Sequence, residues 1–265
     1  MVPLGFRRHR RSVVNLVLFT VVLLSMPMQA LSRGDLDLPV LPPPEEYGNI
    51  VINRLSAEKD VMPVLFSHWA HRTNYTCRVC HVELEFSMKA NDTGIVCNGG
   101  EMTGKYCTVC HNGKTAFAPR GKEGENCDRC HNAFSDPDRA RFAELKKKLP
   151  AAKFGNEIDW GKALANGLIK PKKSLSNSFS PIVVDRTLLL EAEMAGIAPA
   201  VFPHKAHSEW LDCNICHPDI FNLKKKTTKH FSMWRILNKE FCGVCHLNIA
   251  FPVNDCKRCH PTMRK

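Results

Sequence analysis

The sequence predicts two tandem modules with little regular secondary structure, joined by a partly helical linker. Three observations support this fold class. A Cys-x-x-Cys-His motif occurs six times, with three copies in each half of the 265-residue chain. A second pattern, Phe-x-His-x-x-His, precedes each group of three. Hydrophobic periodicity is sparse through both groups, so long helices and strands are not expected there.

An internal repeat sets the bounds of the modules. The segment Pro63–His71 returns as Pro199–His207, and in both copies the first histidine lies nine residues before the next motif cysteine. Phe117, after the second motif of the first group, corresponds to Phe251 after the second motif of the second group. The repeat predicts module 1 at residues 60–135 and module 2 at residues 197–265.

Each Cys-x-x-Cys-His motif has the pattern of a covalent haem c attachment site. Two thiols bond to the vinyl groups on one porphyrin edge, and the adjacent histidine ligates the iron. Zinc sites and dithiol redox motifs also use Cys-x-x-Cys, but neither needs a histidine directly after it six times. We therefore expect six covalently bound haem c groups, attached at Cys77, Cys80, Cys107, Cys110, Cys127, Cys130, Cys213, Cys216, Cys242, Cys245, Cys256 and Cys259, with proximal iron ligands His81, His111, His131, His217, His246 and His260.

The histidines outside the motifs are candidates for the sixth iron ligand. Beyond the N-terminal segment they number five: His68, His71, His204, His207 and His230. The first four form the two Phe-x-His-x-x-His patterns. Residues three apart share one side of a helix, so each pair can reach two irons packed on either side of one short helix. We favour ligation by these four over an assignment as surface histidines.

The combination of Phe-x-His-x-x-His with Cys-x-x-Cys-His resembles the class III multihaem cytochromes c, in particular the trihaem proteins of the c-seven type and their tandem relatives. The resemblance covers both modules, about half of the chain. It implies a small α/irregular fold in which haems fill the core and short helices carry the ligands. It also implies these distal ligands: His68 for the iron at Cys77–Cys80, His71 for Cys107–Cys110, His204 for Cys213–Cys216 and His207 for Cys242–Cys245. Phe66, Phe117, Phe202 and Phe251 are expected to pack on haem faces.

The third haem of each module departs from the simplest family pattern, which places a further ligand just before the second motif. Module 1 has no histidine there, and we favour Met102 with Met88 close behind. Module 2 offers His230 and Met233; the likeness of Phe86-Ser-Met88 to Phe231-Ser-Met233 slightly favours the methionine. A thioether is a known axial ligand, although methionine more often fills cores. Cys97 is left unpaired, and we interpret it as a buried bystander rather than a thiolate ligand or a cross-link.

The N-terminal segment has the features of an export signal. Arginines at positions 7, 8, 10 and 11 precede an apolar stretch, residues 13–24, and Ala30 ends a candidate cleavage site. We predict a signal peptide at residues 1–30 and a proline-rich lead-in at 31–59. The alternative is an uncleaved anchor, and membrane association is expected only in that case.

The linker, residues 136–196, is predicted to be partly helical. Asp136-Pro137-Asp138 should begin a helix that continues through Leu149 and is stopped by Pro150. A second short helix is expected at Asp159–Leu168. The linker contains no pattern of catalytic residues, and we expect it to pack on the modules.

The charge does not indicate a nucleic-acid-binding protein. The full chain carries +11, and without the four arginines of residues 1–30 it carries 33 − 26 = +7. Each ferric haem would contribute about −1 net through its propionates, so six would cancel most of this charge. The basic runs lack a recognition motif, and no nucleic acid partner is expected.

These observations predict an exported hexahaem cytochrome, periplasmic or at the cell surface, that carries electrons in an anaerobic or metal-reducing type of respiratory chain. Expected partners are redox proteins: a membrane quinol oxidase complex upstream, and a reductase or outer-surface conduit downstream. Iron with two protein ligands has no open site for a substrate, so we expect a carrier rather than an enzyme. The alternatives are a multihaem reductase with one open haem site and a subunit of a haem-bearing assembly.

Overall fold

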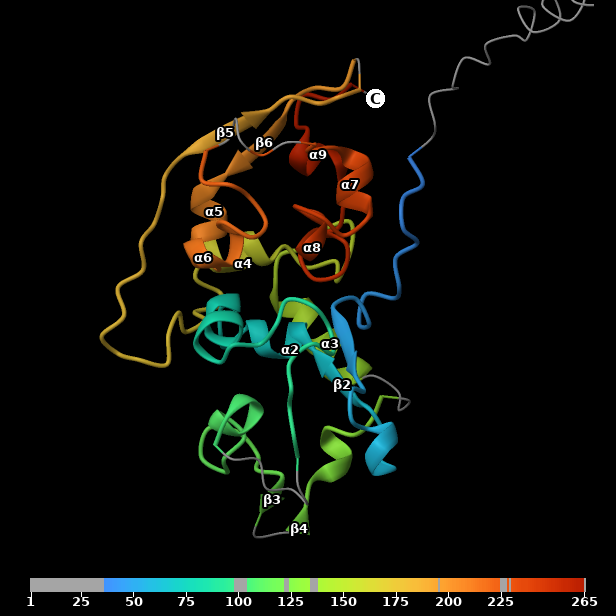
Figure 1. Ribbon diagram of the computed structural model, residues 1–265, viewed down its shortest axis with the longest axis vertical. Coiled ribbons are helices and arrows are strands. Elements are labelled where there is room, and N and C mark those ends of the chain that lie inside the picture. The colour runs from blue at the N-terminus through green and yellow to red at the C-terminus, as the bar shows by residue number, and fades with distance from the viewer. Residues whose placement is uncertain are drawn as a thin grey trace, which may run out of the picture. The chain divides into compact units, whose positions relative to one another are not determined.

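The computed structural model of the chain, drawn in Figure 1, describes residues 36–97, 104–121, 124–133, 138–194, 196–224, 228 and 230–264. The predicted signal peptide and Met102 lie outside these residues. Within them the longest helix has ten residues, so the prediction of a small fold with little regular secondary structure is confirmed. None of the helices in these ranges is long and apolar enough to span a membrane.

Two short antiparallel hairpins introduce the two modules. Strand β1 (Asn49–Ile52) pairs with β2 (Val64–Ser67), and β5 (Thr187–Leu190) pairs with β6 (Ala200–Pro203). The registers correspond, since Ile50 lies opposite Phe66 and Leu188 lies opposite Phe202. In each hairpin the first strand comes from residues before the predicted start of the module, so the lead-in and the linker each contribute one strand.

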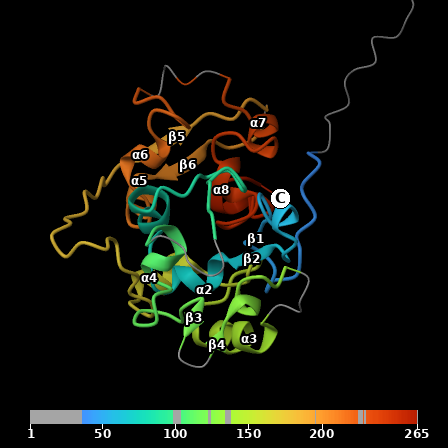
Figure 2. The ribbon, with the colours of Figure 1, turned by 60° about the horizontal axis from the view of Figure 1, so that its bottom comes forward.

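Each hairpin runs directly into a single helical turn that carries the Phe-x-His-x-x-His histidines. These turns are α2 (His68–Arg72) and α5 (His204–Ser208), and Figures 1 and 2 show each one continuing from its strand. The short turn η1 (Ala57–Lys59) lies just before module 1. The remaining elements of module 1 are η2 (Val79–Glu83), η3 (Tyr106–Val109), β3 (Arg120–Gly121), β4 (Gly124–Glu125) and η4 (Cys127–Arg129). Those of module 2 are α6 (Cys213–Cys216), α7 (Met233–Leu237), α8 (Gly243–His246) and α9 (Cys256–Cys259).

The linker contains the two predicted helices. Helix α3 (Arg139–Lys148) begins after Asp138, whose carboxylate accepts the Arg141 N–H at 3.1 Å, and it ends before Pro150. Helix α4 (Trp160–Ala165) is capped in the same way by Asp159 and is shorter than expected. A side-chain acceptor at this position satisfies one of the free N–H groups of a first helical turn, which explains where both helices begin.

The linker packs on module 1 through a small apolar core. Trp69 of α2, Phe142 of α3 and Ile158 are buried together, and the rings of Trp69 and Phe142 meet edge to face with centroids 5.2 Å apart. Figure 1 shows α2 and α3 side by side. From Leu38 onwards the chain forms one compact unit, which contains both modules and the linker.

Candidate haem-binding sites

Each of the six Cys-x-x-Cys-His motifs forms approximately one helical turn. In five of them the backbone N–H of the motif histidine donates to the carbonyl of the first cysteine at 2.8–2.9 Å, at His111, His131, His217, His246 and His260. The remaining motif, Cys77–His81, is the first in the chain, and it continues into the π-helical turn η2. A bond between residues four apart brings the first thiol and the imidazole to the same side of the turn. This arrangement suits attachment of one porphyrin by its edge and its iron.

Ten histidines share one ring arrangement. In each, Nδ1 lies 2.5–3.1 Å from a backbone carbonyl oxygen, and the ten are His68, His71, His81, His111, His131, His204, His207, His217, His246 and His260. A carbonyl only accepts, so Nδ1 must carry the proton and the Nε2 lone pair is left for a metal. The ten are the six motif histidines and the four of the Phe-x-His-x-x-His patterns.

The carbonyl acceptors repeat between the modules for the motif histidines. In the first two motifs of each module the acceptor belongs to a phenylalanine four to six residues further along: Phe86, Phe117, Phe221 and Phe251. In the third motifs the acceptors are Met62 and Ala198, each two residues before the second strand of its hairpin. These partners were not predicted, although the recurring phenylalanine after the first two motifs is a usable signal.

The hairpins orient the other four histidines. The carbonyl of Gly48, just before β1, accepts from Nδ1 of His68 at 2.7 Å, and that of Arg186, just before β5, accepts from Nδ1 of His204 at 3.1 Å. The second histidine of each pair donates to the last residue of the preceding strand, Ser67 or Pro203, at 2.9 Å. The strands therefore fix the ring orientation of the predicted distal ligands.

One phenylalanine in each module contacts both of these histidines. Phe66 meets His68 edge to face with centroids 4.9 Å apart and stacks on His71 at 4.4 Å. Phe202 repeats the geometry with its two histidines at 4.8 and 4.3 Å. Phe117 and Phe251 similarly place an edge against His111 and His246. We expected these four rings on haem faces, and the structure shows them against histidine rings.

The spacing of two histidine pairs tests whether an iron would fit. The rings of His71 and His111 have centroids 6.2 Å apart, and those of His207 and His246 are also 6.2 Å apart. A metal–nitrogen bond of about 2 Å plus about 1 Å from Nε2 to the ring centre, on both sides, gives about 6 Å. Both separations are compatible with one iron between two imidazoles, and the pairing that the resemblance implied stays a prediction.

Burial favours the uncharged form of five of the ten histidines. Desolvation lowers the pKa of His68 to about 3 and that of His246 to about 4, and it lowers the pKa values of His71, His81 and His207. Neutral imidazole is the form that ligates iron. Desolvation likewise raises the pKa of the Cys80 and Cys242 thiols to about 12.

The remaining candidate ligands differ from these ten histidines. His230 is exposed, has a φ of 58°, and has no carbonyl acceptor for its ring among the described residues. Met233 is half-buried at the start of α7, and Met88 is 36% exposed. Cys97 is exposed, so its interpretation as a buried bystander is wrong.

Comparison with known proteins agrees with the geometry. Residues 64–132 and 200–261 match the family model described as "Cytochrome c7 and related cytochrome c". A solved "c7-type three-heme cytochrome domain" is 32% identical, with 31% of this chain covering 100% of that one and a TM-score of 0.27. The C-terminal hexaheme fragment of GSU1996 is 24% identical over 83% of this chain and 99% of that one, with a TM-score of 0.26. The N-terminal hexaheme fragment is 23% identical over 82% and 99%, with a TM-score of 0.24. No curated protein matched the chain.

The two matched segments fall one in each module. Each segment contains three Cys-x-x-Cys-His motifs and the histidines that the hairpin orients. The chain therefore belongs to the cytochrome c7 family and is a tandem c7-type multihaem cytochrome.

Proposed function

We propose that this protein is an exported electron carrier that binds six haem c groups, three in each module. The observation that carries the proposal is the shared ring arrangement of ten histidines, each with Nδ1 held by a backbone carbonyl and Nε2 left free. A haem iron with two axial protein ligands supplies one-electron oxidation and reduction and has no open site for a substrate.

Four of the ten histidines serve as distal ligands in this proposal. His71 ligates the iron held by His111, and His207 ligates the iron held by His246, as their 6.2 Å centroid separations support. By the same repeat, His68 and His204 serve the first haems of their modules. A backbone acceptor for every ring fixes its orientation without an ionisable partner, so the ligands keep one geometry across a wide pH range.

Methionine completes the third haem of each module in this proposal. Met233 is favoured over His230 because that histidine is exposed and its ring has no carbonyl acceptor among the described residues. Met102 is the corresponding ligand of module 1. A thioether ligand raises the reduction potential relative to a second histidine, so the third haem of each module would be the easiest to reduce. The partners are redox proteins of a respiratory chain outside the cytoplasm.

The test is haem counting followed by carbon monoxide binding. The full chain is produced with a c-type haem maturation system, and haems are counted by intact mass and by pyridine haemochrome. We expect six haems per chain, an N-terminus near residue 31 and no carbon monoxide bound to the ferrous protein. Fewer haems would contradict the assignment of the motifs. Carbon monoxide binding by the wild-type protein would indicate an open iron and favour a reductase.

Single substitutions test the distal assignments in the same assay. His71→Ala and His207→Ala should each create one carbon monoxide site per chain, because each removes one axial ligand. His230→Ala is the matched control and should create none. If both ligand variants still bound no carbon monoxide, the distal assignment would be wrong even though the haem count stood.

A further inference from the structure

The two modules meet at their first Cys-x-x-Cys-His motifs. Turn η2 of module 1 packs beside α6 of module 2. The backbone N–H of Arg78, inside the first motif, donates to the carbonyl of Trp210 at 3.2 Å. Trp210 lies three residues before Cys213, the first cysteine of module 2's first motif. The contact therefore joins equivalent attachment sites of the two repeats.

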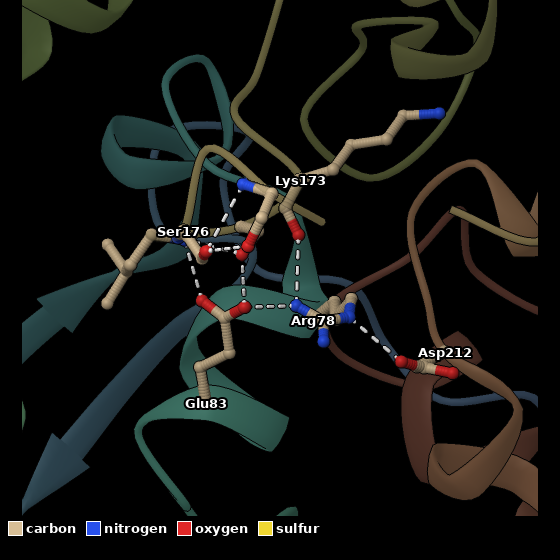
Figure 3. A network of polar contacts seen from close by, with 8 residues as sticks. Arg78, Glu83, Lys173, Ser176 and Asp212 are labelled. Carbon is tan, nitrogen blue, oxygen red and sulfur yellow. Dashed lines mark hydrogen bonds and ion pairs between the residues drawn. The ribbon is translucent and has the colours of Figure 1, made fainter. Parts of the chain in front are cut away.

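The side chain of Arg78 strengthens this contact, as Figure 3 shows. Its Nε donates to the Asp212 carboxylate at 2.8 Å, and its Nη1 pairs with Glu83 of η2. Asp212 directly precedes Cys213 and also accepts the Cys213 N–H at 2.7 Å, so it caps α6. The Arg78 side chain is only 13% exposed, and an ion pair this well shielded is screened less by salt than a surface pair.

A segment of the linker covers the same arginine. The carbonyl of Lys173 accepts from Arg78 Nη1 at 3.2 Å, and the ring of Phe179 lies 3.7 Å from the Arg78 Cζ. Glu83 in turn accepts from the Ser174 hydroxyl and from the Leu175 N–H. Residues 173–179 therefore form a strap over the Arg78–Asp212 pair, which agrees with the low exposure of the guanidinium.

Other contacts between the modules also start near the first motif of module 1. Arg72, five residues before Cys77, donates from Nη2 to the Ile249 carbonyl at 2.9 Å. The Tyr47 hydroxyl donates to the neighbouring Ala250 carbonyl at 2.7 Å. Both acceptors follow the second motif of module 2. Within module 1, the two arginines that reach module 2, Arg72 and Arg78, lie just before and inside the first attachment motif.

We propose that Arg78 is a positioning residue that, through Asp212, holds the first haem site of module 1 against the first haem site of module 2, and that electrons pass between the modules at this junction. This rests on the function proposed above. The exchange needs no proton and no bond change: one electron leaves a ferrous iron on one side, which becomes ferric, and reduces a ferric iron on the other. The chain would then work as two trihaem groups joined at their first sites.

The experiment measures redox interactions between individual haems by nuclear magnetic resonance during a redox titration of the full haem-loaded chain. Each haem is assigned, and the influence of each oxidation on every other haem is extracted. Because the Coulomb interaction falls with distance, the largest interaction between modules should involve the haems at Cys77–Cys80 and Cys213–Cys216. A larger interaction involving the second or third haem of module 1 would overturn the proposal.

Variants then test the role of the ion pair. Asp212→Asn keeps a side chain that can cap α6 but removes the charge that Arg78 holds. It should weaken the first-site interaction by less than about twofold, because that interaction falls with the separation of the two sites and the other contacts between the modules remain, and it should leave interactions within each module unchanged. Arg78→Gln should act in the same direction. An unchanged interaction in both variants would refute the positioning role.

Arg235→Gln is the matched control. Arg235 pairs with Glu240 five residues further along, at 2.6 Å, just as Arg78 pairs with Glu83. Both members of the Arg235–Glu240 pair lie within module 2. The control should leave the interaction between modules at its wild-type value, and a loss as large as that in Asp212→Asn would show that any lost pair has this effect.

The haem count of each variant separates this proposal from the proposed function. Six haems with the strongest link elsewhere would refute the junction alone, whereas empty first motifs would refute both.

Discussion

Replacing Asn156 by alanine should weaken the contact between the linker and the lead-in. Asn156 is only 5% exposed. Its Nδ2 donates to the carbonyls of Pro44 and Tyr47 at 2.7 and 2.6 Å, and its Oδ1 accepts from the Trp160 indole at 3.3 Å. Alanine removes all three hydrogen bonds, of which the one to Tyr47 is buried and the other two are partly buried.

The expected cost follows from those three bonds. A lost hydrogen bond of this kind destabilises a protein by about 1 kcal/mol, and by more where the remaining partner stays buried. We therefore expect the free energy of unfolding of Asn156→Ala to fall by about 3 kcal/mol. The measurement is guanidinium unfolding of the haem-loaded protein followed by far-ultraviolet circular dichroism, with wild type and variant compared at an equal slope.

Asn74→Ala is the control for this prediction. The Asn74 side chain is exposed and donates only to the neighbouring Thr73 hydroxyl, so its loss should change the free energy of unfolding by less than about 0.5 kcal/mol. Equal effects in the two variants would refute the reasoning that Asn156 joins the linker to the lead-in. A loss below about 1 kcal/mol in Asn156→Ala would show that water replaces its bonds.

Three further predictions concern single side chains. Phe66→Leu removes the ring that contacts both His68 and His71. It should lower the free energy of unfolding by about 1 kcal/mol and broaden the low-spin ferric signal in electron paramagnetic resonance. An unchanged signal would contradict an orienting role for this ring. Asp138→Ala removes the cap of α3 and should lower the free energy of unfolding by about 1 kcal/mol in the same denaturant assay, whereas Asp138→Asn should lower it much less. Burial raises the pKa of Tyr47 above its usual value of about 10, so the unfolded chain ionises first and the free energy of unfolding should fall as pH rises above 10. The Tyr47→Phe variant should show a smaller fall between pH 9 and 11. Parallel stability curves for the variant and the wild type would count against a buried phenol.

Local signals were sufficient for much of the fold. The two linker helices follow from an acidic cap, and Pro150 ends the first of them. The one-turn helices that carry the Phe-x-His-x-x-His histidines follow from the repeat. The strands β1 and β5 were not predicted, since four residues carry little periodicity and each strand forms only by pairing with residues 10 or more positions away.

The candidate sites show the same division. The six attachment motifs and four further histidines could be read directly, because cysteine and histidine are rare and their spacing is specific. Most acceptors of the ring N–H groups could not, because a backbone carbonyl is present at every residue; the phenylalanine that recurs after the first two motifs of each module was the exception. The Arg78–Asp212 contact was also missed. Arg78 occupies a variable position of its motif, and 134 residues separate it from its partner.

The repeat shows that backbone geometry, rather than particular side chains, orients the histidines predicted to be ligands. The third-motif histidines donate to Met62 in module 1 and to Ala198 in module 2, two residues with unrelated side chains. Gly48 and Arg186 likewise provide equivalent acceptors for His68 and His204. What each pair shares is its position relative to the hairpin. A core filled largely by cofactors offers few side chains for positioning, so two hairpins of four-residue strands hold these carbonyls at their ends. The unpredicted hairpins are thus the elements on which the predicted ligand sites depend.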